Sequence, residues 1–199
     1  MVVLAIVGGV VAMLLQSVSN RNSNTKTKAF LRQFTVLSRE LHTRAKLNGA
    51  VYRLVIDLKS SSPGNGKEAP VQQYWVEKAN GKAVIKPDEE RKAWEEARKS
   101  EKEKTPDPRG FSIDASMTKS PKDLPPTLRF ERVELTRLKD PVTEGKAYIH
   151  YLPQGLVDEA AVHLRNEKKQ TWTVSIHPLT GRAEVISKSV SLEEMRSQK

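Results

Sequence analysis

Three histidines are the residues best suited by type to form a chemical site. His150, His163 and His177 fall on three predicted strands, and on neighbouring strands such side chains would form a row. A zinc site would also need close registry and a supporting carboxylate. All three lie on the face opposite the predicted core rows of the last strands. We therefore expect surface histidines, with no metal ion and no cofactor.

The carboxylates suggest no catalytic arrangement. Asp57, Glu77 and Asp158 form no recognisable acid–base pair, and Glu89–Lys104 has the mixed charge of a solvated surface. The sequence contains no G-x-S-x-G, H-E-x-x-H, P-loop or G-x-G-x-x-G motif. Because it has no cysteine, it has neither a disulfide framework nor thiolate chemistry. We expect a non-enzymatic protein without a small-molecule substrate.

Basic residues give the chain a formal net charge of +10, from 34 Lys and Arg against 24 Asp and Glu. Such a charge favours contact with lipid headgroups, nucleic acid or acidic proteins. The candidate nucleic-acid contacts are Arg165, Lys168, Lys169 and Arg182, which lie in two neighbouring predicted hairpins and together would neutralise several phosphates. The alternative is a pair of ordinary basic hairpins beside anionic lipid or a partner, since no aromatic stacking platform accompanies them.

The rest of the chain is arranged around its first stretch, Met1–Val18, which carries no charge. Eighteen helical residues span about 27 Å, close to the hydrocarbon thickness of a bilayer. A cleavable signal peptide and a buried core helix are the alternatives. No basic segment precedes the apolar run, no small-residue cleavage site follows it, and soluble helices are seldom apolar all round. We expect a membrane anchor, whose lipid and assembly contacts are Val2, Val3, Leu4, Ile6, Val7, Val10, Val11, Leu14 and Leu15.

An amphipathic helical pattern follows the polar residues 19–24. Phe30, Phe34, Leu37 and Leu41 recur at helical spacing, and Gly49 offers a left-handed cap. One helix of about 47 residues would be roughly 70 Å long. Its apolar stripe is expected to pack on a sheet, against Tyr52, Leu54, Ile56, Val162, Trp172 and Val174.

Alternating apolar residues predict strands through the rest of the chain. The predicted strands are Val51–Leu58, Gln73–Lys78, Thr127–Leu138, Lys146–Leu152, Ala160–Asn166, Thr171–His177 and Arg182–Lys188. Asn80-Gly81 predicts a tight turn, Pro87–Lys104 a charged helix that docks through Trp94, and Thr105–Pro126 a long surface loop. In that loop, Phe111, Ile113 and Met117 are expected to tuck into the protein.

These elements predict an α+β fold, in which a long N-terminal helix, membrane-spanning in its first half, packs on an antiparallel β-sheet or β-sandwich domain. We assign residues 1–24 to the transmembrane helix and hinge, 25–190 to the globular domain and 191–199 to a polar tail with weak helical character. The charged segment 86–126 is expected to be an insertion in the domain.

The N-terminus and four later segments resemble type IV pilin-like proteins of the pseudopilin H and FimT-type family. The resembling segments are Val2–Gly8, Tyr52–Asp57, Tyr74–Glu77, Tyr151–Gly155 and Thr180–Arg182. The family's basic leader, cleavage glycine and assembly glutamate are expected upstream of Met1, and no residue of this sequence takes the role of that glutamate.

The resemblance implies a pilin-like fold and a minor pseudopilin of a type II secretion pseudopilus. It also implies a single-pass protein of the inner membrane, with its β domain in the periplasm. Its partners would be other pseudopilins or pilins, through the N-terminal helix, and inner-membrane lipid. The alternative is a FimT-like minor pilin that binds DNA through its basic C-terminal hairpins during type IV pilus-dependent uptake. The sequence leaves open whether the assembly is a pseudopilus or a pilus.

Overall fold

Helix α1 (Val2–Asn48) is one continuous helix of 47 residues, as the sequence predicts. The structure is a computed structural model that describes residues 2–58, 71–79 and 110–197, with side chains from Thr25 onward. At 1.5 Å per residue α1 is about 70 Å long. It ends at Asn48, and the next residue, Gly49, has a φ of 57°, the left-handed conformation that glycine adopts without steric cost.

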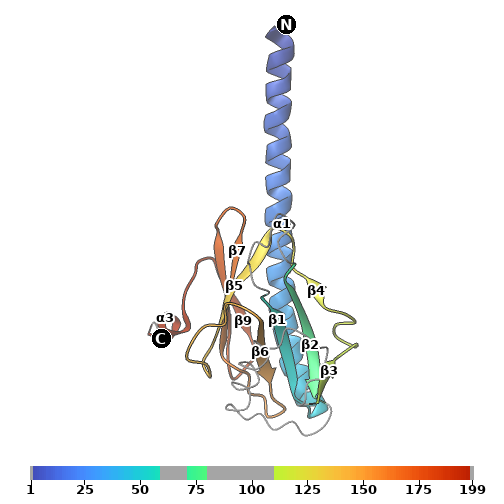
Figure 1. Ribbon diagram of the computed structural model, residues 1–199, viewed down its shortest axis with the longest axis vertical. Coiled ribbons are helices and arrows are strands. Elements are labelled where there is room, and N and C mark those ends of the chain that lie inside the picture. Colours follow the sequence, from blue (N-terminus) through green and yellow to red (C-terminus); the bar gives the residue numbers. More distant parts are fainter. Residues whose placement is uncertain (1, 59–70, 80–109, 198–199) are drawn as a thin grey trace.

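The two halves of α1 lie in different surroundings. The C-terminal half packs on the β domain, whereas the N-terminal half extends beyond it (Figure 1). The side chains of the predicted anchor, Met1–Val18, lie outside the described residues. In the part of the chain whose side chains are described, which begins at Thr25, no helical segment combines the length and the apolarity needed to cross a bilayer.

The first sheet has the order β3-β2-β1-β6, and β4 also pairs with β2. Its strands pair antiparallel throughout. They are β1 (Tyr52–Asp57), β2 (Gln73–Ala79), β3 (Phe111–Ile113), β4 (Lys122–Asp123) and β6 (Lys146–Tyr151). The first predicted hairpin is therefore confirmed, with Leu54 opposite Val76 in the register.

The second sheet has the order β5-β7-β8-β9 and is also antiparallel. Its strands are β5 (Leu128–Leu135), β7 (Ala160–Asn166), β8 (Thr171–Ile176) and β9 (Ala183–Ile186), and a short helix, α3 (Leu192–Ser197), follows. The predicted inner rows of β7 and β8 meet in register, with Val162 opposite Val174 and Leu164 opposite Trp172.

One apolar core joins α1 to both sheets. The rings of Phe30 and Phe34 lie 5.7 and 5.9 Å from that of Tyr74 on β2, and 6.4 and 6.3 Å from that of Phe130 on β5. Phe34 and Leu41 are fully buried, and Leu37 is partly buried. All the sheet partners expected for this stripe belong to the same core, with Trp172 at its margin. The fold is α+β, with antiparallel sheets and an N-terminal helix.

The segment before β5 departs from the prediction of a long surface loop. Residues 111–113 and 122–123 form β3 and β4, which both pair with the outer edge of β2. This pairing satisfies backbone groups that an open edge would expose. Phe111 is buried and Met117 packs against the core as expected, but Ile113 is 43% exposed, so its predicted burial is wrong. The predicted turn at Asn80-Gly81, the helix over 87–104 and Trp94 lie outside the described residues.

Candidate functional site

Two turns of the β domain converge on one face of α1. The Ser38 hydroxyl, fully buried, donates to the Gly181 carbonyl at 2.8 Å and shares a 2.9 Å hydrogen bond with the Tyr151 hydroxyl. One helical turn later, Nε2 of His42 lies 3.0 Å from the Gly155 carbonyl oxygen. These turns belong to two of the segments that carry the family resemblance, Tyr151–Gly155 and Thr180–Arg182. The helix is therefore held on the domain by specific polar contacts as well as by apolar packing.

Tyr151 takes part in this junction as a neutral group. Its side chain is fully buried, and burial raises the pKa of its phenol well above the ordinary value. The hydroxyl therefore stays protonated and available for its hydrogen bond with Ser38. The sequence held a signal for this site, because Ser38 occupies a polar position within the helical stripe of Phe34 and Leu41.

His163 is buried, at 1% exposure, so the expectation of a surface histidine is wrong at this position. It does face away from the core, but the C-terminal segment covers that face. Thr173, beside it on β8, donates to the Lys188 carbonyl at 2.8 Å and accepts from the Val190 amide at 3.0 Å. Its Oγ1 also lies 3.3 Å from Nδ1 of His163.

Glu134 is the carboxylate beside His163. Its Oε1 lies 3.0 Å from Nε2 of His163, but the angles between them do not fit a hydrogen bond. It accepts from the Leu192 amide at 2.8 Å and from Arg132 at 3.0 Å. Burial alone would raise the pKa of Glu134, but these donors and His163 hold it below its usual value. Burial, reinforced by Arg132, lowers the pKa of His163 despite Glu134. The cluster ties the C-terminal tail to the second sheet.

His150 is likewise buried, at 1% exposure, so the prediction of a surface histidine is wrong at this position too. Its Nδ1 lies 2.8 Å from Oδ2 of Asp158, which also accepts from the His150 amide and from Arg137, each at 3.0 Å. Burial by itself would raise the pKa of Asp158, but His150 and Arg137 hold it below the ordinary value. The ring of Phe111 lies against His150 at 6.2 Å. The side chain of Asp158 is 22% exposed, and its bonds to His150 and Arg137 hold this part of the fold together.

The three histidines do not form a row. His150 belongs to the first sheet, whereas His163 is on β7 of the second sheet and His177 directly follows β8. His177 is half-buried, and its Nδ1 accepts from the Leu179 amide at 3.3 Å. Within 2–58, 71–79 and 110–197, no group of three or more His, Cys, Asp or Glu side chains is placed to hold a metal ion.

Glu77 forms an ion pair with a buried arginine, Arg53. Arg53, 2% exposed, places its guanidinium 2.5 Å from Glu77, over the rings of Phe111 and Tyr148 at 3.9 and 4.5 Å. Trp75 donates its indole N–H to the same carboxylate at 2.7 Å. Glu77 and Asp158 therefore belong to separate groups, Glu77 with Arg53 and Trp75, and Asp158 with His150 and Arg137.

The four candidate nucleic-acid contacts do not form one patch. Arg165, Lys168 and Lys169 lie in the β7–β8 hairpin, whereas Arg182 follows the turn at the other end of β8. Consecutive turns of an antiparallel sheet lie at opposite ends of their shared strand, here about 20 Å apart. All four side chains are exposed, and Arg165 and Arg182 lie 3.4 and 3.5 Å from Glu131 and Glu184.

Comparison of the chain with protein-family models, with curated proteins and with solved structures finds no match.

Proposed function

We propose that this chain is a minor pseudopilin-type structural subunit of a type II secretion pseudopilus, anchored in the inner membrane with its β domain in the periplasm. One observation carries the proposal: a single helix of 47 residues lies outside the domain in its first half and forms part of the domain core in its second. The first half has the apolar sequence Met1–Val18, which suits lipid and helix–helix contact.

The proposal gives the junction at Ser38 and His42 a mechanical role. A pilin-like subunit must keep its domain in a fixed orientation on the helix, because the helices of neighbouring subunits set the positions of the domains. Two turns hydrogen-bonded to α1, together with Phe34 and Leu41 in the core, supply that rigid connection. The partners are other pseudopilins, bound through apolar helix packing, and inner-membrane lipid.

Membrane association and topology test this proposal directly. The full chain should remain in the membrane pellet after alkaline carbonate extraction, and a reporter fused at Lys199 should be active only in the periplasm. Val10→Lys with Leu14→Lys should release the chain, since each lysine in an apolar span is strongly unfavourable to insertion. The matched control, Ser23→Lys with Thr25→Lys, places the same charges outside the apolar stretch, so this variant should stay in the membrane. Extraction of the unaltered chain, or cytoplasmic activity of the fusion, would overturn the proposal.

The DNA-uptake alternative was supported by a cluster of four basic residues in two neighbouring hairpins. Arg182 is distant from the β7–β8 hairpin, so these four residues do not form one cluster. A gel shift with the purified chain distinguishes the two functions. Binding that falls steeply with salt and weakens with Arg182→Ala would favour DNA.

A further inference from the structure

We propose that the end of the domain from which α1 projects is a binding surface for anionic phospholipid headgroups. This surface, the basic collar, consists of Lys26, Lys28, Arg129, Arg165, Lys168 and Lys169. The inference rests on the proposed function, because the lipid in question belongs to the membrane that the first half of α1 enters.

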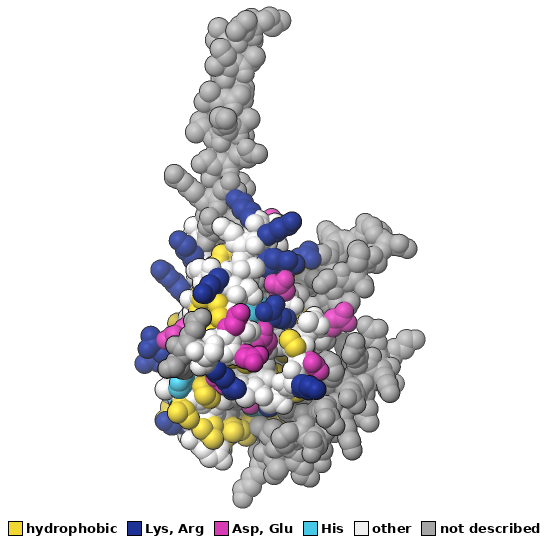
Figure 2. Space-filling model, turned by 90° about the vertical axis from the view of Figure 1, so that its left-hand side faces the viewer, with side chains coloured by type: hydrophobic (Ala, Val, Ile, Leu, Met, Phe, Trp, Pro, Cys, Tyr) yellow, Lys and Arg dark blue, Asp and Glu magenta, His cyan; other side chains and the backbone are white. Residues whose placement is uncertain are grey.

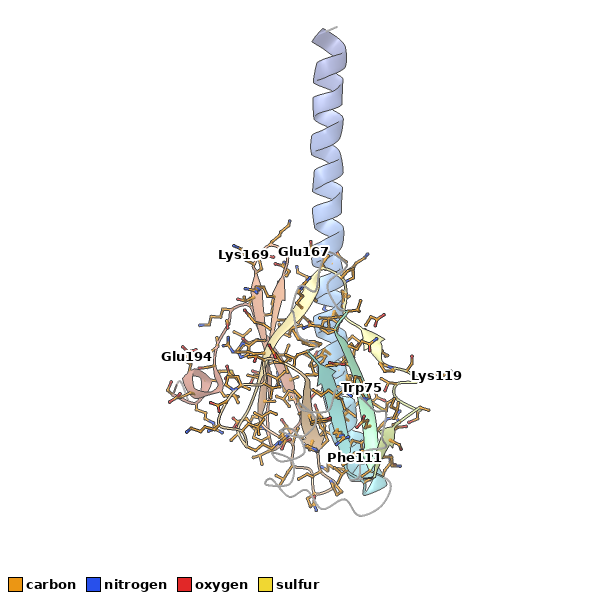
Figure 3. All side chains as sticks on the ribbon, in the orientation of Figure 1. Trp75, Phe111, Lys119, Glu167, Lys169 and Glu194 are labelled. Carbon is orange, nitrogen blue, oxygen red and sulfur yellow. The ribbon has the colours of Figure 1, made fainter. Side chains whose placement is uncertain are left out.

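The collar brings together residues that are far apart in the sequence. The β7–β8 hairpin reaches α1 at a shallow hollow of about 160 Å³, which is lined by Thr27, Lys28, Gln170 and Trp172. Figure 3 shows Lys169 and Glu167 at the tip of this hairpin, beside the point where α1 leaves the domain. Figure 2 shows Lys and Arg side chains gathered at the same end.

The charge of the collar is unbalanced. Within the described residues, its six cations are accompanied by two carboxylates, Glu131, which lies 3.4 Å from Arg165, and the exposed Glu167, so the collar has a net positive charge. Arg129 and Arg165 are both exposed and lie directly opposite each other in the pairing of β5 with β7. Like charges at such a cross-strand position destabilise a sheet. Bound phosphate would offset this repulsion, so the arrangement favours an anionic ligand.

The helix places the collar near the membrane surface. Because α1 is continuous, Lys26 lies about 12 Å beyond Val18 along the helix axis. The headgroup region of each leaflet is roughly 5–8 Å thick, which leaves Lys26 about 5 Å above it. This distance is within the Debye length of about 8 Å at physiological ionic strength, and long basic side chains reach further.

The position of the cations also favours lipid over nucleic acid. They flank the base of a projecting helix, so their common ligand is a surface that this helix penetrates. A nucleic-acid strand needs a groove that follows its backbone and aromatic side chains on which bases stack. In the described part of the collar, the one aromatic side chain at the hollow, Trp172, is partly buried against the core.

The test uses the full chain inserted in nanodiscs. Because the chain has no cysteine, Glu167→Cys provides a single site for a fluorescent donor at the hairpin tip. Energy transfer to a lipid-bound acceptor should be higher in nanodiscs containing phosphatidylglycerol than in phosphatidylcholine alone. At about 1 M salt, where the Debye length falls to about 3 Å, the difference should disappear.

Charge reversal separates the collar from the rest of the surface. Lys168→Glu with Lys169→Glu should abolish the response to phosphatidylglycerol. The matched control, Lys139→Glu with Arg182→Glu, makes the same charge change at the opposite end of the second sheet and should keep it. Equal melting temperatures of the two variants verify that both are folded.

Three results would overturn the inference. If the chain inserts but energy transfer is equal in both lipids, the collar does not bind anionic headgroups, and the proposed function is unaffected. Binding of DNA that is lost in the collar variant, without any lipid response, assigns the surface to nucleic acid instead. A chain that fails to enter nanodiscs overturns both proposals, because the anchor itself is then absent.

Discussion

The backbone of Gly181 lies against His42 of α1 so closely that a Cβ atom at position 181 would be 2.4 Å from the His42 Cβ. Real Cβ atoms essentially never approach so closely, and the atom met here belongs to the rigid part of the side chain. Gly181 also has a φ of 62°, which other residues rarely adopt. The absence of a side chain therefore lets this turn come close enough for its carbonyl to accept from Ser38.

Replacing Gly181 by alanine should lower the free energy of unfolding by about 2–4 kcal/mol, from left-handed backbone strain together with the clash. The matched control is Gly145→Ala, with a φ of 74° and no atom within 4 Å of its Cβ. It carries only the backbone cost of about 1 kcal/mol. Urea unfolding of the full chain in detergent measures both. Equal losses would mean that the turn moves away from α1 without cost.

The apolar half of α1 should be essential to the stability of the β domain. Phe34→Ala removes a fully buried ring from the shared core and should cost about 3–5 kcal/mol. Arg39→Ala, on the exposed face of the same helix, should stay within about 0.5 kcal/mol. Thermal unfolding followed by circular dichroism compares them. If both variants melt like the parent, the β domain folds independently of the helix.

Features set by local patterns could be predicted from the sequence. The length of α1, its end before Gly49 and seven strands follow from apolar periodicity and turn residues, which act over short distances along the chain. β3 and β4 could not be predicted in this way, because strands of two or three residues contain too little alternation. They form because β2 offers them an edge to pair with.

The environment of the polar side chains depends on contacts between distant segments. The strand pattern correctly places His163 away from the core, but its burial comes from residues 188–192, which no local pattern assigns to that face. The two basic turns are neighbours in the sequence but lie at opposite ends of β8, and the antiparallel path of the chain separates them.

Acid should destabilise the domain in two steps. The folded chain holds the pKa of His163 below its ordinary value of 6.5. Below about pH 6.5 the unfolded chain therefore binds a proton that the folded chain does not, and stability falls. Glu134 and Asp158, whose pKa values are held below 4.5 and 3.8, stabilise the fold above these values. Their contribution is lost as the pH falls through their folded pKa values.

Urea unfolding at a series of pH values measures both steps. His163→Gln should flatten the decline that begins near pH 6.5 while the decline at lower pH remains. Glu134→Gln should reduce the loss at lower pH. A free energy of unfolding that is constant from about pH 7.5 to pH 5 would contradict the assignment to His163.

Ser38 should contribute more to stability than its size suggests. Ser38→Ala leaves the buried Tyr151 hydroxyl and the Gly181 carbonyl without this partner, and an unsatisfied buried group costs about 1–3 kcal/mol. Thr43→Ala is the matched control, because it removes a hydroxyl from the same helix whose hydrogen bond to the Arg39 carbonyl is exposed. That change should stay within about 0.5 kcal/mol.

A double-mutant cycle with Tyr151→Phe isolates the contact between the two hydroxyls. Removing both partners leaves no unpaired phenol, so the double variant should lose less stability than the sum of the two single variants. Thermal and urea unfolding of the full chain in detergent supply the four free energies. Strict additivity would show that the hydroxyls of Ser38 and Tyr151 act independently, so that the hydrogen bond from Ser38 to the Gly181 carbonyl would be its effective link between α1 and the β domain.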